Sequence, residues 1–126
     1  MNVHMELRYQ VETQHDVAVV HCSGRLVRGK ALDEFRRTIE ALDHLRVLVV
    51  DLSEIDQLDA GGLGTLLLLR NWARVDSVQM KLVNPSAFLL RVLQSTKLTS
   101  VFEISSLEEA LCILQTPGAR PHYAAA

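Results

Sequence analysis

The strongest constraint on the fold is an apolar, β-branched run, RVLVVDLS, at Arg46–Ser53. A strand that is apolar on both faces is typical of a parallel sheet, because helices cover both sides of such a sheet. A leucine-rich helical segment follows at about Ala60–Val75, and a further strand follows that at Val78–Asn84. This order of strand, helix and strand predicts a right-handed crossover between two parallel strands.

The chain before this run predicts an antiparallel hairpin and one helix. Apolar and polar residues alternate from Met5 to Val11, and a second apolar segment, VAVVHCSG, follows at residues 17–24 after a short link. Two strands joined in this way pair antiparallel. From near Lys30, apolar residues recur at the spacing of an amphipathic helix.

The chain after residue 84 predicts a helix, a short strand and a last helix. The first of these helices begins at Pro85 and ends at about Ser95, and the strand lies around Val101–Ile104. Ser105 or Ser106 then caps the last helix, since a glutamate follows each serine three residues later, as in a capping box. The predicted fold is α/β, with a mostly parallel sheet of four to five strands, an N-terminal antiparallel hairpin and about four helices.

Composition predicts one domain and excludes several classes of function. The chain has 126 residues, which suffices for one core, at about residues 5–116, with a flexible tail at 117–126. Its formal net charge of −2 gives no basic field for nucleic acid. No apolar run approaches the about 20 residues of a membrane span, so we expect no direct membrane insertion and a cytoplasmic protein. Cys22 and Cys112 have no metal-ligand or redox spacing, so we expect no metal and no cofactor.

The start of the leucine-rich segment raises the main functional question. Gly61, Gly62 and Gly64 lie within one turn of it, although each glycine in a helix costs about 1 kcal/mol relative to alanine. A phosphate-binding loop is one interpretation, but DAGGLG fits neither common pattern, and Asp59 places a negative charge there. A catalytic turn is another, but no serine lies between the glycines. The histidines are scattered, and we interpret His21 as a partly buried packing residue.

Two interpretations of the glycines remain open. Glycines in a first helical turn allow close packing against a neighbouring strand, with Asp59 as the N-cap, which accounts for one or two of the three. Alternatively, the missing side chains expose the backbone and let another protein approach closely. The leucines beyond, which surround most of the helix, favour this second interpretation, because they must be covered on more than one side.

The segment DLSEIDQLDAGGLGTLLLL resembles the signature of STAS domains, the family of bacterial anti-sigma factor antagonists, in which D-L-S-x-V-x-x-x-D-S-S-G-L-G links a buried strand to a helix. The segments HCSGRLV and MKLVNPSAFLLRVLQSTKLTSVFEISSLEEAL also look like parts of that family. The resemblance covers about residues 5–116. It implies the same fold as the order of elements does.

The resemblance also implies a function without catalysis. Family members bind an anti-sigma factor that is also a serine kinase, and phosphorylation of a serine at the start of the signature helix separates the partners. Asp59 matches the signature aspartate, Ala60 replaces one serine, and Gly61 falls where the phosphoacceptor should be, so the usual switch would be absent. Thr65 and Ser53 are the nearest substitute hydroxyls, although surface or capping roles are favoured for them. The implied partner-binding residues are Asp59, Ala60, Gly61, Gly62, Leu63, Gly64, Thr65 and Phe88.

Other functions remain open beside the anti-sigma factor antagonist. STAS domains without an acceptor serine also occur as subunits of lipid-transport ABC complexes, and a nucleotide or small-ligand-binding domain is a third class. A homodimer is a further possibility, since an exposed apolar helix edge also serves self-association. Arg25 and Arg28 could form an electropositive rim for an acidic partner, but a solvated loop needs no such explanation.

Overall fold

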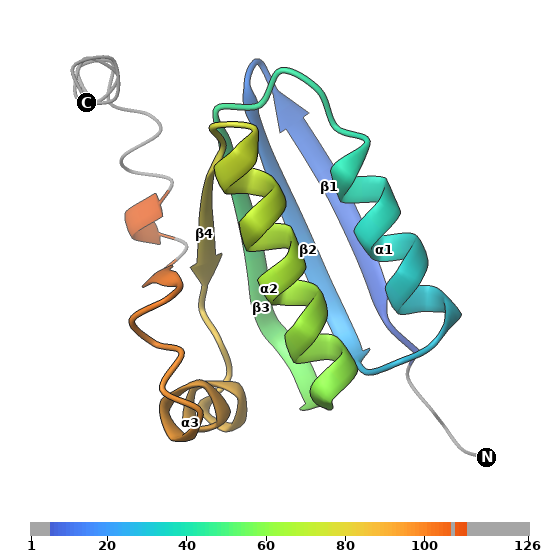
Figure 1. The fold of residues 1–126 in the computed structure, drawn as a ribbon, viewed down its shortest axis with the longest axis vertical. Helices are drawn as coiled ribbons and strands as arrows, with labels where there is room; N and C mark the ends of the chain where they lie inside the picture. The colour runs from blue at the N-terminus through green and yellow to red at the C-terminus, as the bar shows by residue number, and fades with distance from the viewer. Residues whose placement is uncertain (1–5, 107, 111–126) are drawn as a thin grey trace.

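One five-stranded sheet organises residues 6–106 and 108–110, the part of the chain that the computed structural model describes (Figure 1). The strands lie side by side in their order along the chain, from β1 to β5. The elements are β1 Arg8–Gln14, β2 Val17–Leu26, α1 Lys30–Glu40, β3 Val47–Leu58, α2 Ala60–Val75, β4 Gln79–Val83, α3 Ala87–Ser95 and β5 Glu103–Ser105. Residues 108–110 are helical as well.

The pairing of the strands confirms the predicted topology. β1 and β2 pair antiparallel, whereas β2, β3, β4 and β5 pair in parallel. Every residue of β3 from Val47 to Leu52 is buried, as expected for a strand with neighbours on both edges and cover on both faces. The α/β fold with an N-terminal hairpin, inferred from alternating hydrophobicity, is therefore the observed one.

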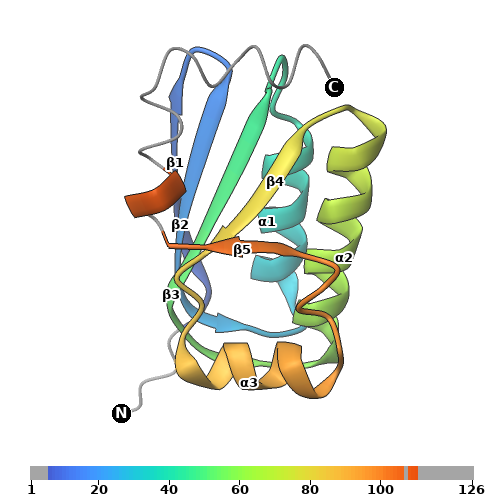
Figure 2. The same ribbon diagram turned by 90° about the vertical axis from the view of Figure 1, so that its left-hand side faces the viewer.

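The helices occupy two positions relative to the sheet. α1 and α2 pack side by side on one face, and the main hydrophobic core, which includes Phe35, Leu66 and Leu69, lies between them and the strands (Figure 1). α3 lies across the end of the sheet at which β3 and β4 terminate (Figure 2). On the opposite face a smaller buried cluster joins Val47, Val49, Val83 and Ala110.

Several boundaries differ from the predicted ones. β3 continues to Leu58, five residues beyond the predicted end at Ser53, and it pairs with β2 along this extension. α3 begins at Ala87 rather than at Pro85, because the Ser86 hydroxyl caps it by accepting the Leu89 N–H at 3.2 Å. β5 covers residues 103–105 instead of 101–104.

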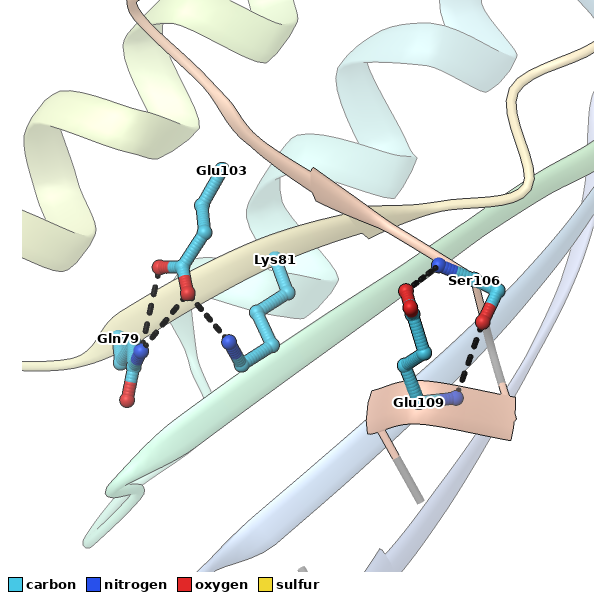
Figure 3. Close-up of polar contacts among 5 residues, drawn as sticks. All are labelled: Gln79, Lys81, Glu103, Ser106 and Glu109. Atoms are coloured by element: carbon cyan, nitrogen blue, oxygen red, sulfur yellow. Dashed lines mark hydrogen bonds and ion pairs between the residues drawn. The ribbon is translucent and has the colours of Figure 1, made fainter. Parts of the chain in front are cut away.

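The capping box predicted for the last helix is confirmed at Ser106. Its hydroxyl accepts the Glu109 N–H at 3.0 Å, and its own N–H donates to the Glu109 carboxylate at 3.1 Å (Figure 3). Ala110, one residue beyond Glu109 in this helix, is buried. Residue 107, the rest of the predicted last helix and the predicted tail lie outside the described residues.

A buried charge joins the short strand β5 to the sheet. Lys81 is only 4% exposed, and its ammonium group pairs with the Glu103 carboxylate (Figure 3). The amide of Gln79 donates to both oxygens of the same carboxylate at 3.1 Å. A charge at such a depth is tolerated only when it is paired, so this cluster fixes β5 against β4.

Candidate functional site

The glycine turn, residues 59–65, lies at the end of the sheet where functional surfaces of such folds gather. β2, β3 and β4 all run toward this end, and α1, α2 and α3 all begin there (Figures 1 and 2). The carboxyl ends of parallel strands form the common location of binding sites in open α/β sheets. The turn links the end of β3 to the start of α2.

Asp59 is the N-cap of α2, as predicted, and it also holds the neighbouring loop. Its carboxylate accepts the backbone N–H of Gly62 at 2.9 Å and that of Arg28 at 3.0 Å. These hydrogen bonds, first that of Arg28 and then that of Gly62, hold the pKa of Asp59 below its usual value. The side chain therefore fastens the β2–α1 loop to the start of α2.

The three glycines have three different surroundings. A Cβ atom on Gly62 would lie 1.8 Å from the carbonyl oxygen of Leu26, so no side chain fits there. A Cβ atom on Gly61 would lie 3.0 Å from the Cβ of Arg28, which is tight but could be relieved by a small shift. A Cβ atom on Gly64 would have nothing within 4 Å. Close packing thus requires Gly62, constrains Gly61 and leaves Gly64 unexplained.

The remaining residues of the turn differ in accessibility. Ala60 is exposed, and Leu63 is half-buried and packs against the core. Thr65 is only 7% exposed, so its hydroxyl cannot reach a kinase or a partner in this conformation. Ser53 is exposed on β3.

The side of α2 that faces away from the sheet is largely apolar, although Asn71 and Arg74 are also exposed there near its C-terminal end. We define the α2 outer face as Ala60, Gly64, Leu68, Asn71 and Val75, which recur at intervals of three and four residues and so form one stripe. Leu68 is 55% exposed and Val75 is 72% exposed, two of the three most exposed large apolar side chains among the described residues. An uncovered apolar stripe of this kind marks an interaction surface. The glycine turn forms its N-terminal end.

Phe88 is the third exposed large apolar residue, at 39%, and it lies on α3. It borders a shallow groove of about 640 Å³ together with Arg91, Val92 and Ser95. The start of α3 is fixed to the end of β3, because the Ser86 hydroxyl donates to the Ile55 carbonyl at 3.1 Å. α3, which carries Phe88, and the glycine turn therefore lie at the same end of the molecule (Figure 2).

His21 forms a polar cluster that sequence reasoning missed. Its Nδ1 lies 3.0 Å from the Asp51 carboxylate of β3, and its Nε2 lies 3.5 Å from the Glu12 carboxylate of β1. The register of three strands creates this arrangement, so His21 is not merely the packing residue we expected. Each ring nitrogen of His21 therefore faces a carboxylate.

The cluster predicts a dependence of stability on pH. The hydrogen bond to Asp51 raises the pKa of His21 above 6.5, whereas burial lowers it to a smaller extent. A raised folded-state pKa means that this stabilisation is fully present below about pH 6.5 and is lost as the pH rises through the folded-state value. We therefore expect the urea midpoint of unfolding to fall across this range, and His21→Gln to remove that fall.

The pKa of Asp51 is shifted in the opposite direction, so Asp51 affects stability at low pH. Burial raises the pKa of its carboxyl, but the Ser53 N–H and His21 together hold the pKa below its usual value of 3.8. The pair is therefore most stabilising between about pH 4 and 6.5. His15→Asn serves as the matched control, because His15 lies exposed in the β1–β2 turn and asparagine tolerates its positive φ of 58°. A pH profile unchanged by His21→Gln would contradict this role of the cluster.

The remaining groups indicate no chemistry of their own. Burial raises the pKa of the Cys22 thiol to about 12, so Cys22 is an unreactive apolar residue. Within residues 6–106 and 108–110, no three His, Cys, Asp or Glu side chains gather as a metal site. In that same part of the chain, no helix has the length and apolar character needed to cross a bilayer.

These features define a class of protein, namely an α/β domain with an accessible glycine turn at the carboxyl end of its sheet. Over residues 8–110 the sequence matches the STAS domain, and the chain belongs to that family. The fold is similar to that of the anti-sigma factor antagonist SpoIIAA in its unphosphorylated form, with a TM-score of 0.71 and 20% identity over 82% of this chain and 93% of that one.

Two further structures share the fold. The Bacillus cell fate determinant SpoIIAA in its phosphorylated form has a TM-score of 0.67 and 20% identity, over 86% of this chain and 100% of that one. An anti-sigma factor antagonist from Mycobacterium paratuberculosis has a TM-score of 0.62 and 24% identity, over 88% and 96% of the two chains. At these identities the likeness establishes the fold, which confirms the resemblance noted in the sequence.

Proposed function

We propose that this chain is a regulatory protein-binding module of the anti-sigma factor antagonist kind, with a single STAS domain at about residues 5–116. It is not an enzyme, and it acts in the bacterial cytoplasm by docking on an anti-sigma factor or a related serine kinase. The docking surface comprises the glycine turn and Phe88, with the α2 outer face as its continuation. Gly62 and Thr65 are buried and support this surface from beneath.

The exposed apolar stripe of α2 is the observation that carries this proposal. Leu68 and Val75 remain more than half exposed, although α2 is packed on its other side by a complete core. Gly64 lies on the same stripe with open space around it, so packing within the domain does not require a glycine there. A surface that is largely apolar and bare at its N-terminal end suits a protein partner that approaches closely.

In this proposal the chain is not regulated by phosphorylation at the position that carries the acceptor serine in the family. Gly61 occupies the position that we assign to the phosphoacceptor, and glycine has no oxygen to accept a phosphoryl group. The module therefore stays permanently in the unmodified form, and its action is set by its abundance or by another site. A phosphate there would add about −1.5 to −2 charges beside Asp59 and would oppose docking.

A kinase assay tests this part of the proposal. We expect no phosphorylation when the wild-type chain is incubated with its partner kinase and ATP. The Gly61→Ser variant should become labelled at residue 61, since Arg28 needs to move only a few tenths of an ångström to admit a side chain. Stoichiometric labelling of the wild type at Ser53, the exposed hydroxyl nearest in sequence, would instead indicate a substitute switch and contradict the permanent unmodified state.

Affinity purification identifies the class of partner. We expect the wild-type chain to retain an anti-sigma factor or serine kinase from the lysate of its own cell. Retention of an ATPase with an ABC permease would instead place the chain in a lipid-transport complex, and retention of no protein would contradict the docking module. A thermal shift with ATP or GTP separates the ligand-binding class, for which a stabilisation at millimolar ligand is required.

A further inference from the structure

β1 forms one edge of the sheet, and β2 is its only strand neighbour within residues 6–106 and 108–110 (Figure 1). An edge strand exposes a row of unpaired backbone N–H and C=O groups, and proteins commonly protect such an edge with proline, lysine, a bulge or a very short strand. β1 spans seven residues, contains neither proline nor lysine, and pairs with β2 in a regular register. The other edge strand, β5, has only three residues. β1 is therefore the edge that is open to a further strand.

The hairpin turn determines which backbone groups of β1 face the free edge. His15 and Asp16 form the turn, so Gln14 and Val17 are its closing pair. A two-residue turn closes on a hydrogen-bonded pair, and hydrogen-bonded and non-hydrogen-bonded pairs alternate from there along an antiparallel ladder. The N–H and C=O groups of alternate residues therefore point away from β2, namely those of Tyr9, Val11 and Thr13.

The side chains of β1 are complementary to those of a second copy of the same strand. When two β1 strands pair antiparallel about a two-fold axis at Gln10, Arg8 of each copy lies opposite Glu12 of the other. Tyr9 then lies opposite Val11, and the backbone groups of both residues face the edge. Opposite charges and aromatic–aliphatic pairs stabilise neighbouring strands. An axis one residue to either side loses both ion pairs, so the charges favour this one register.

The residues concerned are available for these contacts. Arg8 is exposed and takes part in no ion pair within the part of the chain that the structure describes. The Glu12 side chain is 71% exposed, and only one of its oxygens lies near His21, at 3.5 Å, so the carboxylate can accept a further donor. Tyr9 and Val11 are half-buried against the main core, which their pairing would continue from one copy into the other.

We propose that two copies of this chain pair through β1 and form a symmetric dimer with one continuous sheet. Arg8–Glu12 ion pairs lie on one face of this sheet, and Tyr9–Val11 contacts lie on the face that α1 covers. α2 packs over β2, β3 and β4, so pairing at the β1 edge leaves the glycine turn open to a docking partner. The dimer and the docking function are therefore independent of each other.

Exchanging the two charges tests this register. We expect sedimentation equilibrium of the wild-type chain to show a reversible monomer–dimer equilibrium. Arg8→Glu places like charges opposite each other twice in the dimer, so the dissociation constant should rise by about tenfold or more. Combining Arg8→Glu with Glu12→Arg restores opposite charges at both places, and this double variant should dimerise within about threefold of the wild type. Urea unfolding of each variant verifies that the monomer is folded.

Thr13→Pro tests the backbone pairing independently of charge. Thr13 is exposed, and proline is tolerated at an edge position whose N–H faces solvent, so β1 should stay paired with β2. The missing N–H and the proline ring should hinder a second strand, and we expect the dissociation constant of the dimer to rise by about tenfold or more. Thr13→Ala is the matched control, because it keeps the N–H and should dimerise as the wild type does.

Either of two results would overturn the proposal. The first is a wild-type chain that stays monomeric at concentrations up to about 1 mM. The second is a dimer whose affinity is unchanged in Arg8→Glu and in Thr13→Pro, because its interface would then lie elsewhere. These measurements use the chain alone, so their failure leaves the docking function untouched, and a failure of docking leaves the dimer untouched.

Discussion

Gly62→Ala should lower the free energy of unfolding by about 3 kcal/mol or more, although alanine is the better helix former. The new Cβ atom would lie 1.8 Å from the Leu26 carbonyl oxygen and 2.7 Å from its carbon. Both atoms belong to the backbone of β2, so the clash cannot be relieved by turning a side chain. Either α2 moves away from the sheet or β2 distorts, and the Asp59 cap is disturbed in both cases.

Gly64→Ala is the matched control, with the opposite sign. Its Cβ atom meets nothing within 4 Å, so the variant should gain up to about 1 kcal/mol from helix propensity alone. Urea unfolding followed by the fluorescence of Trp72, the single tryptophan, measures both variants. Equal stabilities for the two alanine variants would mean that α2 does not approach β2 as closely as described.

Gly64→Glu should weaken docking strongly while leaving the fold intact. The side chain has open space, and a negative charge near the N-terminus of a helix is favourable, so we expect no loss of stability. In a docked complex the same carboxylate would be buried without a partner, which costs several kcal/mol. We therefore expect the dissociation constant to rise by about 100-fold or more. Calorimetric titration with the partner retained by the wild type measures this change.

A second variant tests whether an added negative charge weakens docking only when it lies at the start of α2. Gln14→Glu adds the same charge at an exposed position, the last residue of β1, and should bind as the wild type does. β1 ends at the opposite end of the sheet from the start of α2 (Figure 1). If Gly64→Glu also binds normally, the partner does not cover the start of α2. The docking surface would then have to be sought elsewhere on the domain.

Much of the fold could be predicted because hydrophobic periodicity reports local structure. The run at Val47–Val50 and the leucines of α2 fixed the type and order of the central elements. The extension of β3 to Leu58 was missed because its neighbour β4 ends opposite Asp51. Beyond that point β3 pairs only with β2, so exposed polar residues such as Glu54 and Asp56 interrupt the apolar pattern.

The site could be predicted only in part, since its decisive contacts join distant segments. The sequence located the glycines and the Asp59 cap, which are local features. It did not reveal that Gly62 is required by Leu26, that Arg28 covers Gly61, or that Gly64 is free. The His21–Asp51 contact likewise depends on strand register, which no single segment encodes.

Hydrogen exchange of the partner-bound chain tests the docking surface most directly. Peptides that cover residues 59–68 should exchange at least tenfold more slowly in the complex than in the free chain, because the partner covers the glycine turn and the adjoining stripe. Peptides from β1, at the far edge of the sheet, should be unchanged. Protection confined to β1, with residues 59–68 exchanging as in the free chain, would contradict the account.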